Sequence, residues 1–166
     1  MSNPQPSIMT LKRLAKEKAD FEKESELQTS TGMCQFRLQP SRPSAAADEN
    51  LAWSITLFGP KDSPYDGGCF SVKLVFPGDY PMKAPTMRFE TKIFHPNIDW
   101  ADGSVCMDSL ASGWSPAWGP RTLLEGVLSL LTAPAQGADS PLNCDAAKLL
   151  RPPTSDVRCF NSVAKM

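Results

Sequence analysis

Five cysteines and a single histidine are the side chains of this sequence best suited to nucleophilic or proton-transfer chemistry. A thiolate is both a good nucleophile and a good leaving group, so a cysteine can accept an acyl group and later pass it on. The cysteines are Cys34, Cys69, Cys106, Cys144 and Cys159. No C-x-x-C pair occurs and one histidine cannot supply a Cys/His zinc set, so no metal site is expected. An odd number of scattered cysteines favours reduced thiols, as in the cytoplasm or nucleus.

Cys106 differs from the other four cysteines because it follows Gly103 in an irregular loop. Functional cysteines favour such loop positions. The other four lie in or next to strand and helix patterns, where we expect small buried apolar residues. The charged residues nearest to Cys106 in sequence are Asp102 and Asp108, so no neighbouring cation activates the thiol. The thiol of Cys106 is therefore not expected to be unusually reactive on its own.

Hydrophobic periodicity predicts one helix followed by four strands. Residues 8–24 place apolar side chains on one stripe at helical spacing, with cations on most of the remaining surface. From residue 34 the spacing changes to two, which is typical of strands with one face on a core. The predicted strands are Cys34–Leu38, Trp53–Leu57, Phe70–Phe76 and Thr86–Glu90. Short turns between them predict an antiparallel meander.

A long irregular segment, residues 91–119, separates the strands from the last helices. Its three tryptophans argue against disorder, and ordered loops of this length are usually functional. Pro120 favours a helix start, and Pro134 ends that helix. Shorter helices are predicted at Leu142–Leu150 and from Thr154 onward, where packing is needed to stabilise them.

Length and charge indicate one domain without a general affinity for polyanions. The chain has 166 residues, with 17 Lys and Arg against 18 Asp and Glu. That balance provides no field for DNA, RNA or an anionic membrane, and no stretch reaches the roughly 18 apolar residues of a membrane span. The first residues lack the charged-then-apolar run of a signal peptide. We predict one α+β domain over residues 8–166 after a flexible tail of residues 1–7, in the cytoplasm or nucleus, without nucleic-acid or membrane partners.

The segment around Cys106 carries several motifs in a fixed order. His95-Pro96-Asn97 precedes Gly103-x-x-Cys106, and Trp114-x-Pro116-Ala117 follows. In these motifs the sequence resembles the ubiquitin-conjugating enzymes. The resemblance runs from about Leu11 to Leu150 and includes Gly59-Pro60, Ser63-Pro64-Tyr65, Gly67-Gly68, Phe76-Pro77, Asp79-Tyr80-Pro81 and Ala84-Pro85.

The resemblance implies both a fold and an activity. The fold is α+β: an N-terminal helix, a four-stranded antiparallel meander, a long active-site loop and C-terminal helices. The activity is that of an acyltransferase. Its cysteine, here Cys106, accepts ubiquitin from the activating enzyme as a thioester, and ubiquitin is then transferred to a substrate lysine with a ligase.

The resemblance also implies roles for the residues around the thiol. Asn97 is the candidate for stabilising the oxyanion formed when lysine attacks, because an amide donates without titrating; alternatively, it bonds its own loop backbone. His95 is implied to support the loop rather than to transfer a proton. Ser140, with its acidic neighbour Asp139, occupies the position of a gate that orients the lysine. The alternative is that Ser140 caps a helix that begins at Pro141.

The partners implied by the resemblance are ubiquitin or a ubiquitin-like protein, an activating enzyme, a RING-type ligase and a protein substrate. The chain is expected to be a monomer with no bound cofactor, since the activating enzyme uses ATP upstream. The first helix is the implied contact for the activating enzyme and the ligase, and two loops also contact the ligase. The partner-binding residues are Lys12, Arg13 and Lys16 on the helix and Met82, Pro116 and Ala117 on the loops. An ordinary solvated face is the alternative for the cations.

Two departures from the family pattern stand out. Asn97 and Cys106 are nine positions apart, one more than the family usually has, so residues 99–102 are expected to bulge. After Leu131, where the family has an acidic residue, Pro and Asn, this chain has Ala133-Pro134-Ala135 and extra residues up to Ala138. The gate loop is therefore altered.

Other readings remain open at this stage. Ala84-Pro85-Thr86 and Ser140-Pro141-Leu142-Asn143 most resemble the class that ubiquitinates mitotic cyclins, and the second pattern also occurs in a class dedicated to another modifier. The chain could thus conjugate another ubiquitin-like protein. It could also be a non-catalytic relative of the same fold that binds ubiquitin. Such relatives usually lack the cysteine, so Cys106 counts against this last reading.

Overall fold

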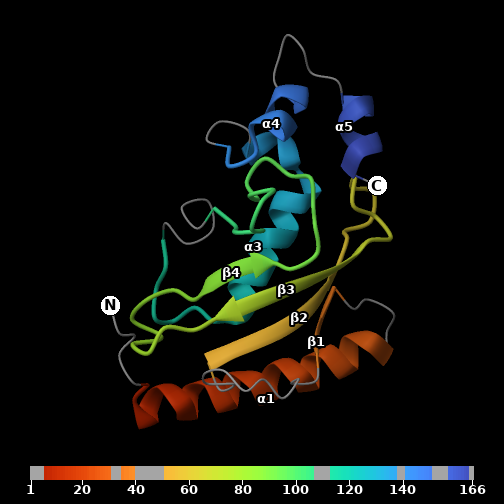
Figure 1. Ribbon diagram of the computed structural model, residues 1–166. Coiled ribbons are helices and arrows are strands. Elements are labelled where there is room, and N and C mark those ends of the chain that lie inside the picture. Colours follow the sequence, from red (N-terminus) through yellow and green to blue (C-terminus); the bar gives the residue numbers. More distant parts are fainter. Residues whose placement is uncertain are drawn as a thin grey trace.

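An antiparallel sheet of four strands forms the centre of the protein (Figure 1). This is a computed structural model that describes residues 6–30, 35–39, 51–106, 113–137, 141–150 and 157–164. The strands are β1 (Phe36–Leu38), β2 (Ala52–Phe58), β3 (Cys69–Val75) and β4 (Thr86–Phe89), and they pair in chain order. The meander predicted from the period-two patterns is therefore confirmed. The start of the first predicted strand, at Cys34, lies outside the described residues.

The helix α1 (Ile8–Ser30) packs on the side of the sheet that begins with β1. Its N-terminus is capped by Ser7, whose Oγ accepts the Thr10 amide at 3.0 Å. Residues 6 and 7, which were predicted as part of a tail, thus lead directly into the helix. Phe21 anchors α1 by stacking on Phe36 of β1, with ring centroids 5.2 Å apart.

The helix α1 is six residues longer than the stripe over residues 8–24 predicted. Its last turns lack large apolar residues at the expected spacing, so periodicity gave no signal there. Ser25 is nevertheless buried, and its hydroxyl donates to the Phe36 carbonyl of β1 at 3.4 Å. A polar contact with the sheet therefore accompanies the extra turns.

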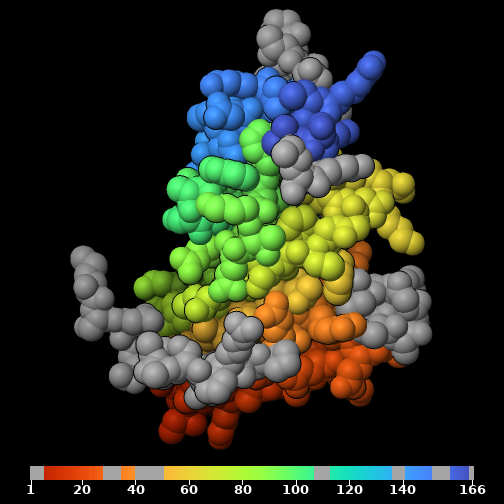
Figure 2. Space-filling view, turned by 45° about the vertical axis from the view of Figure 1, so that its right-hand side comes forward, coloured from red at the N-terminus to blue at the C-terminus, as the bar shows by residue number. Residues whose placement is uncertain are grey.

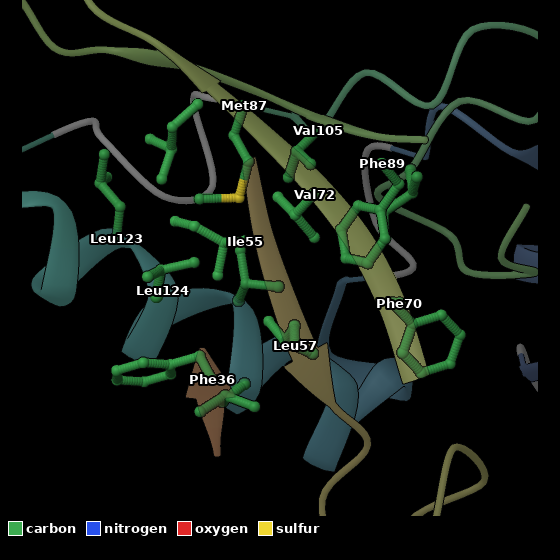
Figure 3. Packing of buried hydrophobic residues seen from close by; sticks show 14 of the residues in the cluster. Phe36, Ile55, Leu57, Phe70, Val72, Met87, Phe89, Val105, Leu123 and Leu124 are labelled. Carbon is green, nitrogen blue, oxygen red and sulfur yellow. The ribbon is translucent and has the colours of Figure 1, made fainter. Parts of the chain in front are cut away.

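The helix α3 (Pro120–Thr132) packs its apolar stripe against the sheet. Figure 3 shows Leu123 and Leu124 of α3 facing Ile55 of β2 within one cluster of buried side chains. Its start at Pro120 and its end before Pro134 were both predicted. Pro134 itself begins a short 3₁₀ turn, η2 (Pro134–Gly137).

Two short helices, α4 (Cys144–Leu150) and α5 (Val157–Ala164), complete the described chain. Figures 1 and 2 both show them at the end of the molecule opposite α1. The helix α5 is anchored by Phe160, which is fully buried and lies 5.6 Å from the ring of Phe94. No described helix is long and apolar enough to cross a membrane.

Candidate active site

A short hairpin, residues 97–106, carries Cys106 and is attached to the edge of the sheet. The Phe89 amide of β4 donates to the Gly103 carbonyl at 2.8 Å, and the Val105 amide donates to the Met87 carbonyl at 3.3 Å. Within the hairpin, the Cys106 amide donates to the Asn97 carbonyl at 2.9 Å, and Asp99 and Ser104 pair in the same way. Each half of the hairpin thus continues the sheet beyond β4.

Val105 fixes the direction in which Cys106 points. Its side chain is buried and lies beside Val72 and Phe89 in the core (Figure 3). Because side chains alternate along an extended backbone, the next residue points away from the core. Cys106 is accordingly partly exposed, and it is a free thiol. The predicted nucleophile is therefore accessible, and the backbone that carries it is bonded to β4 on one side and to residues 97–99 on the other.

Gly103 makes the attachment to β4 possible. Its φ of +76° is a conformation that L side chains rarely adopt. A Cβ on Gly103 would also lie 2.0 Å from the Phe89 carbonyl oxygen, which is the neighbouring strand itself. Glycine is required here by both conformation and close approach, which explains why it stands three residues before the thiol.

The extra residue between Asn97 and Cys106 is placed in the turn of the hairpin. Asp99 closes this turn, because its Oδ1 accepts the Ala101 and Asp102 amides at 2.7 and 3.1 Å. Asp102 in turn accepts the Ser104 amide at 2.8 Å, and this hydrogen bond holds the pKa of its carboxyl below the usual range. The bulge expected over residues 99–102 is thus a turn ordered by its own carboxylates.

His95 is fully buried under the base of the hairpin. The Asn97 amide donates to its Nδ1 at 3.0 Å, so Nδ1 carries no proton. The proton is then on Nε2, which donates to the Leu130 carbonyl of α3 at 3.1 Å. Burial lowers the pKa of His95 from 6.5 to about 4. The imidazole is a neutral link between α3 and the hairpin.

Asn97 lies at the base of the hairpin, directly opposite Cys106, and is buried. Its backbone is fixed twice, by His95 at the amide and by Cys106 at the carbonyl. Tyr65 holds the preceding residues, since its hydroxyl donates to the Phe94 carbonyl at 2.7 Å. Two hydrogen bonds through backbone atoms therefore fix the position of Asn97 beside Cys106.

The start of α4 is bound to the same loop. The Leu142 and Asn143 amides both donate to the Pro96 carbonyl, at 2.8 and 2.9 Å. Asn143 caps α4, because its Oδ1 accepts the Ala146 amide at 3.1 Å. The helix that Ser140 was expected to cap does not begin at Pro141, since α4 begins at Cys144. Ser140 and Asp139 themselves lie outside the described residues.

Sequence reasoning missed Asn143, although an asparagine just before Cys144 and three residues before the buried Ala146 was an available signal for a cap. A boundary placed at Pro141 concealed it.

The expectation that the remaining cysteines are buried is wrong for the three that the structure describes. Cys69, Cys144 and Cys159 are all exposed. Cys69 begins β3 on the face shared with Ser71 and Lys73, whereas Phe70 takes the inward position. In α4 and α5 the buried positions belong to other residues, above all Ala146, Ala147 and Phe160. Cys34 lies outside the described residues.

The predicted partner-binding residues lie on α1 and on two loops that touch it. Lys12, Lys16, Met82, Pro116 and Ala117 are exposed. Met82 is 71% exposed, at the tip of the loop before β4. Trp114 joins the two loops, because its Nε1 donates to the Pro81 carbonyl at 2.8 Å. The predicted positions thus form one surface.

Arg13 differs from the two lysines because it is engaged within the protein. Its Nε pairs with Glu17 at 2.8 Å, and its Nη2 donates to the Trp118 carbonyl at 3.0 Å. Glu17 also accepts the Tyr80 hydroxyl at 2.7 Å. The pKa of Tyr80 is raised mainly by burial, so the phenol stays protonated as a donor. Arg13 therefore ties α1 to both loops.

No group of three or more His, Cys, Asp or Glu residues that could hold a metal ion is found in the part of the chain that the structure describes. The chemistry available at the site is that of an accessible thiol beside a buried amide side chain.

Comparisons with known proteins agree with this geometry. The sequence profile of the ubiquitin-conjugating enzymes matches residues 13–163. The chain is 44% identical to the Arabidopsis thaliana protein peroxin-4 over 120 residues, which are 72% of this chain and 74% of that protein. It is 41% identical to the ubiquitin-conjugating enzyme E2 pex4 of Dictyostelium discoideum, over 69% of this chain and 74% of that one.

A solved structure shows the same fold. The crystal structure of a proposed ubiquitin conjugating enzyme from Plasmodium yoelii superposes with a TM-score of 0.78 at 32% identity, covering 97% of this chain and 93% of that one. The profile match spans most of this chain, and the solved structure has the same fold. This chain belongs to the ubiquitin-conjugating enzyme family.

Proposed function

We propose that this ubiquitin-conjugating enzyme carries ubiquitin as a thioester on Cys106. The observation that carries the proposal is the pairing of Cys106 with Asn97 at the base of a hairpin that leaves the thiol accessible. The sulfur attacks the thioester carbonyl on the activating enzyme, whose own thiolate leaves. A substrate lysine then attacks the new thioester, the Cys106 thiolate leaves, and an isopeptide bond forms. ATP is consumed only in the earlier activation.

Replacing Cys106 tests the proposal directly. Cys106→Ser is expected to replace the reductant-sensitive adduct by an ester that survives reductant, because a hydroxyl can form the acyl bond but leaves poorly. Cys69→Ser and Cys144→Ser are matched controls on exposed thiols and are expected to charge normally. The measurement is a charging assay with activating enzyme, ATP and ubiquitin, resolved with and without reductant. Normal thioester formation by Cys106→Ala would refute the proposal.

Asn97 is proposed to stabilise the oxyanion when lysine attacks the thioester. Charging exchanges one thioester for another and is nearly balanced, whereas lysine attack builds negative charge on the carbonyl oxygen with only this protein's groups nearby. Both backbone bonds of Asn97 are independent of its side chain. A substitution can therefore remove the amide while the hairpin keeps its attachment.

Asn97→Ala is expected to slow discharge of the preformed thioester to free lysine on the order of a hundredfold, the usual cost of one oxyanion donor. Charging is expected to survive. Asn97→Asp is the matched control, because it keeps the volume but cannot donate when ionised, and it is expected to be equally slow. The assay follows loss of thioester on a gel. An equal loss of charging and discharge would instead assign Asn97 to building the loop.

Asp139 and Ser140 are proposed to orient the attacking lysine. Support comes from the residues that follow them, because Leu142 and Asn143 are bound to Pro96 beside the active site. A serine can orient an amine but is a poor base at neutral pH. Ser140→Ala is therefore expected to reduce discharge less than Asn97→Ala does, and an unchanged discharge rate would remove Ser140 from the site.

His95 is proposed to hold the loop and not to move protons, because both of its ring nitrogens are engaged within a buried site. Its lowered pKa makes stability depend on pH in a defined direction. The unfolded chain protonates this imidazole near pH 6.5, whereas the folded protein does so only at about 4. As the pH falls through this window, the unfolded state takes up the proton first and folding loses free energy.

The loss at His95 between pH 6.5 and 4 is expected to be about 3 kcal/mol, from 1.36 kcal/mol per unit of pKa difference. The contribution is fully present above pH 6.5. The measurement is the free energy of unfolding of the wild type and of His95→Asn as a function of pH. The difference between the two proteins is expected to shrink as the pH falls. A constant difference would contradict a buried neutral imidazole.

The surface of α1 and its two loops is proposed to bind the other proteins of the pathway. Lys12 and Lys16 would attract the activating enzyme, and Met82 with Pro116 and Ala117 would contact a RING-type ligase. An exposed methionine suits such a contact because it adapts to different partners. The engagement of Arg13 with Glu17 leaves the two lysines as the better probes of recruitment.

Lys12→Glu with Lys16→Glu is expected to slow charging several-fold at low enzyme concentration, with an effect that weakens as salt is added, because rim charges act mainly on association rate. Lys61→Glu, at an exposed turn outside this surface, is the control for each of the two reversals made singly. Equal charging by both variants would leave an ordinary solvated face.

Met82→Asp is expected to reduce only ligase-stimulated discharge, and an unchanged stimulation would remove Met82 from the contact.

The proposed modifier is ubiquitin and the proposed location is the cytoplasm or nucleus, with the chain acting as a monomer. A second candidate location has a specific observation in its favour, because two of the relatives are named peroxin-4 and pex4, which points to the peroxisome. A fluorescently tagged chain compared with a peroxisomal marker separates the two. Competition among ubiquitin-like proteins in the charging assay tests the modifier.

A further inference from the structure

Trp100 occupies the tip of the active-site hairpin and is 51% exposed. Neither the thiol chemistry nor the surface on α1 uses it. Its indole lies edge-to-face with Phe94, with ring centroids 6.2 Å apart. The ammonium of Lys92 lies 5.5 Å from the same ring. An exposed tryptophan is thus held by two neighbours near the reactive cysteine.

The backbone of the tip is as constrained as the ring. Lys92 Nζ donates to the Trp100 carbonyl and, at 3.0 Å, to the Ala101 carbonyl. The carboxylate of Asp99 accepts the Ala101 and Asp102 amides, and that of Asp102 accepts the Ser104 amide. A side chain fixed in this way loses little conformational entropy when a partner covers it, which is typical of residues that dominate binding energy.

The tip and the helix α1 lie at different edges of the sheet. The helix α1 packs beside β1, whereas the hairpin continues the sheet beyond β4, at its opposite edge. A protein bound to α1 leaves Trp100 open. The acceptor must come to Cys106 and is therefore the partner that this position suits.

The distance between Trp100 and Cys106 follows from the hairpin. Asn97 is opposite Cys106, and Trp100 follows three residues later, in the turn of the hairpin. Three residues of fully extended chain span at most roughly 10 Å, so the backbone of Trp100 lies within about 10 Å of that of Asn97. An extended acceptor segment spans the same distance in about three residues.

A groove of about 370 Å³ lies between the tip and the end of β4. Its charged side chains have both signs: Arg88, Glu90, Lys92, Asp99 and Asp102. A peptide of one charge is neither strongly attracted nor repelled by this mixture, so the exposed indole is the feature that discriminates among acceptors.

We propose that Trp100 binds the protein acceptor, through an apolar side chain that lies about three residues from the target lysine. The proposal deepens the function assigned above and rests on Cys106 as the acyl carrier. It defines a class of substrate: an extended segment with a lysine and an apolar residue at this spacing.

The test uses preformed Cys106 thioester and peptides with a single lysine. One pair of peptides has Leu or Ser three residues before the lysine, and a second pair has them three residues after it. In at least one pair the Leu peptide is expected to discharge the wild type roughly tenfold faster, the size of a single dominant contact. Each rate is divided by the rate with free lysine, which has no flanking residues.

The variant Trp100→Ser is expected to abolish the preference for Leu. Trp100→Phe is expected to retain part of this preference, because it keeps an aromatic ring in the hairpin. Val75→Ser, which removes an exposed apolar residue of β3, is the matched control and is expected to keep the preference. A wild type without preference, or a preference that persists in Trp100→Ser, would overturn the proposal. So would an equal loss with peptides and free lysine, which would place Trp100 against the modifier. Failure to form the thioester at all would refute the carrier role of Cys106 and is recognised before any peptide is added.

Discussion

The contact between Gly103 and the backbone of β4 is the constraint on which the active site depends. No side chain fits between Gly103 and the Phe89 carbonyl, and the backbone conformation there is one that other residues rarely adopt. This close approach brings the return strand of the hairpin into register with the sheet. Val105 then enters the core and Cys106 faces outward. The position of the thiol is therefore determined by sheet geometry rather than by a flexible loop.

Two groups of exposed residues are fixed by different parts of the fold. At the β1 side, Arg13 and Glu17 connect α1 to the loops that carry Met82 and Trp118, so this surface behaves as one unit. At the β4 side, the hairpin presents Cys106 and Trp100. Between them, His95 joins the hairpin to α3 through a neutral imidazole. On the proposed roles of these surfaces, the protein that delivers ubiquitin and the protein that receives it would contact different parts of the enzyme.

Periodicity and motifs predicted the parts of this protein that depend on local sequence. Alternation predicted the four strands, and Pro120 and Pro134 bracketed α3. What could not be predicted arises from contacts between distant segments, such as the last turns of α1, the commitment of Arg13 to Trp118 and the binding of Asn143 to Pro96. The exposed cysteines show the same limit, because apolar residues one or two positions away, namely Phe70, Ala146 and Phe160, take the buried positions. The motif singled out Cys106, Asn97 and His95 as candidates, but the hydrogen bonds that join them could be known only from the fold.

The attachment of the hairpin to β4 also covers an edge of the sheet. A β-strand at the edge of a sheet exposes unpaired amides and carbonyls that can pair with another chain. Here residues 103–105 cover the outer edge of β4 with backbone hydrogen bonds. The same bonds that position the catalytic thiol therefore close one side of the sheet against self-association. Changes that loosen the hairpin would therefore have two effects. They would displace the thiol of Cys106, and they would expose the edge of β4 to pairing with other protein molecules.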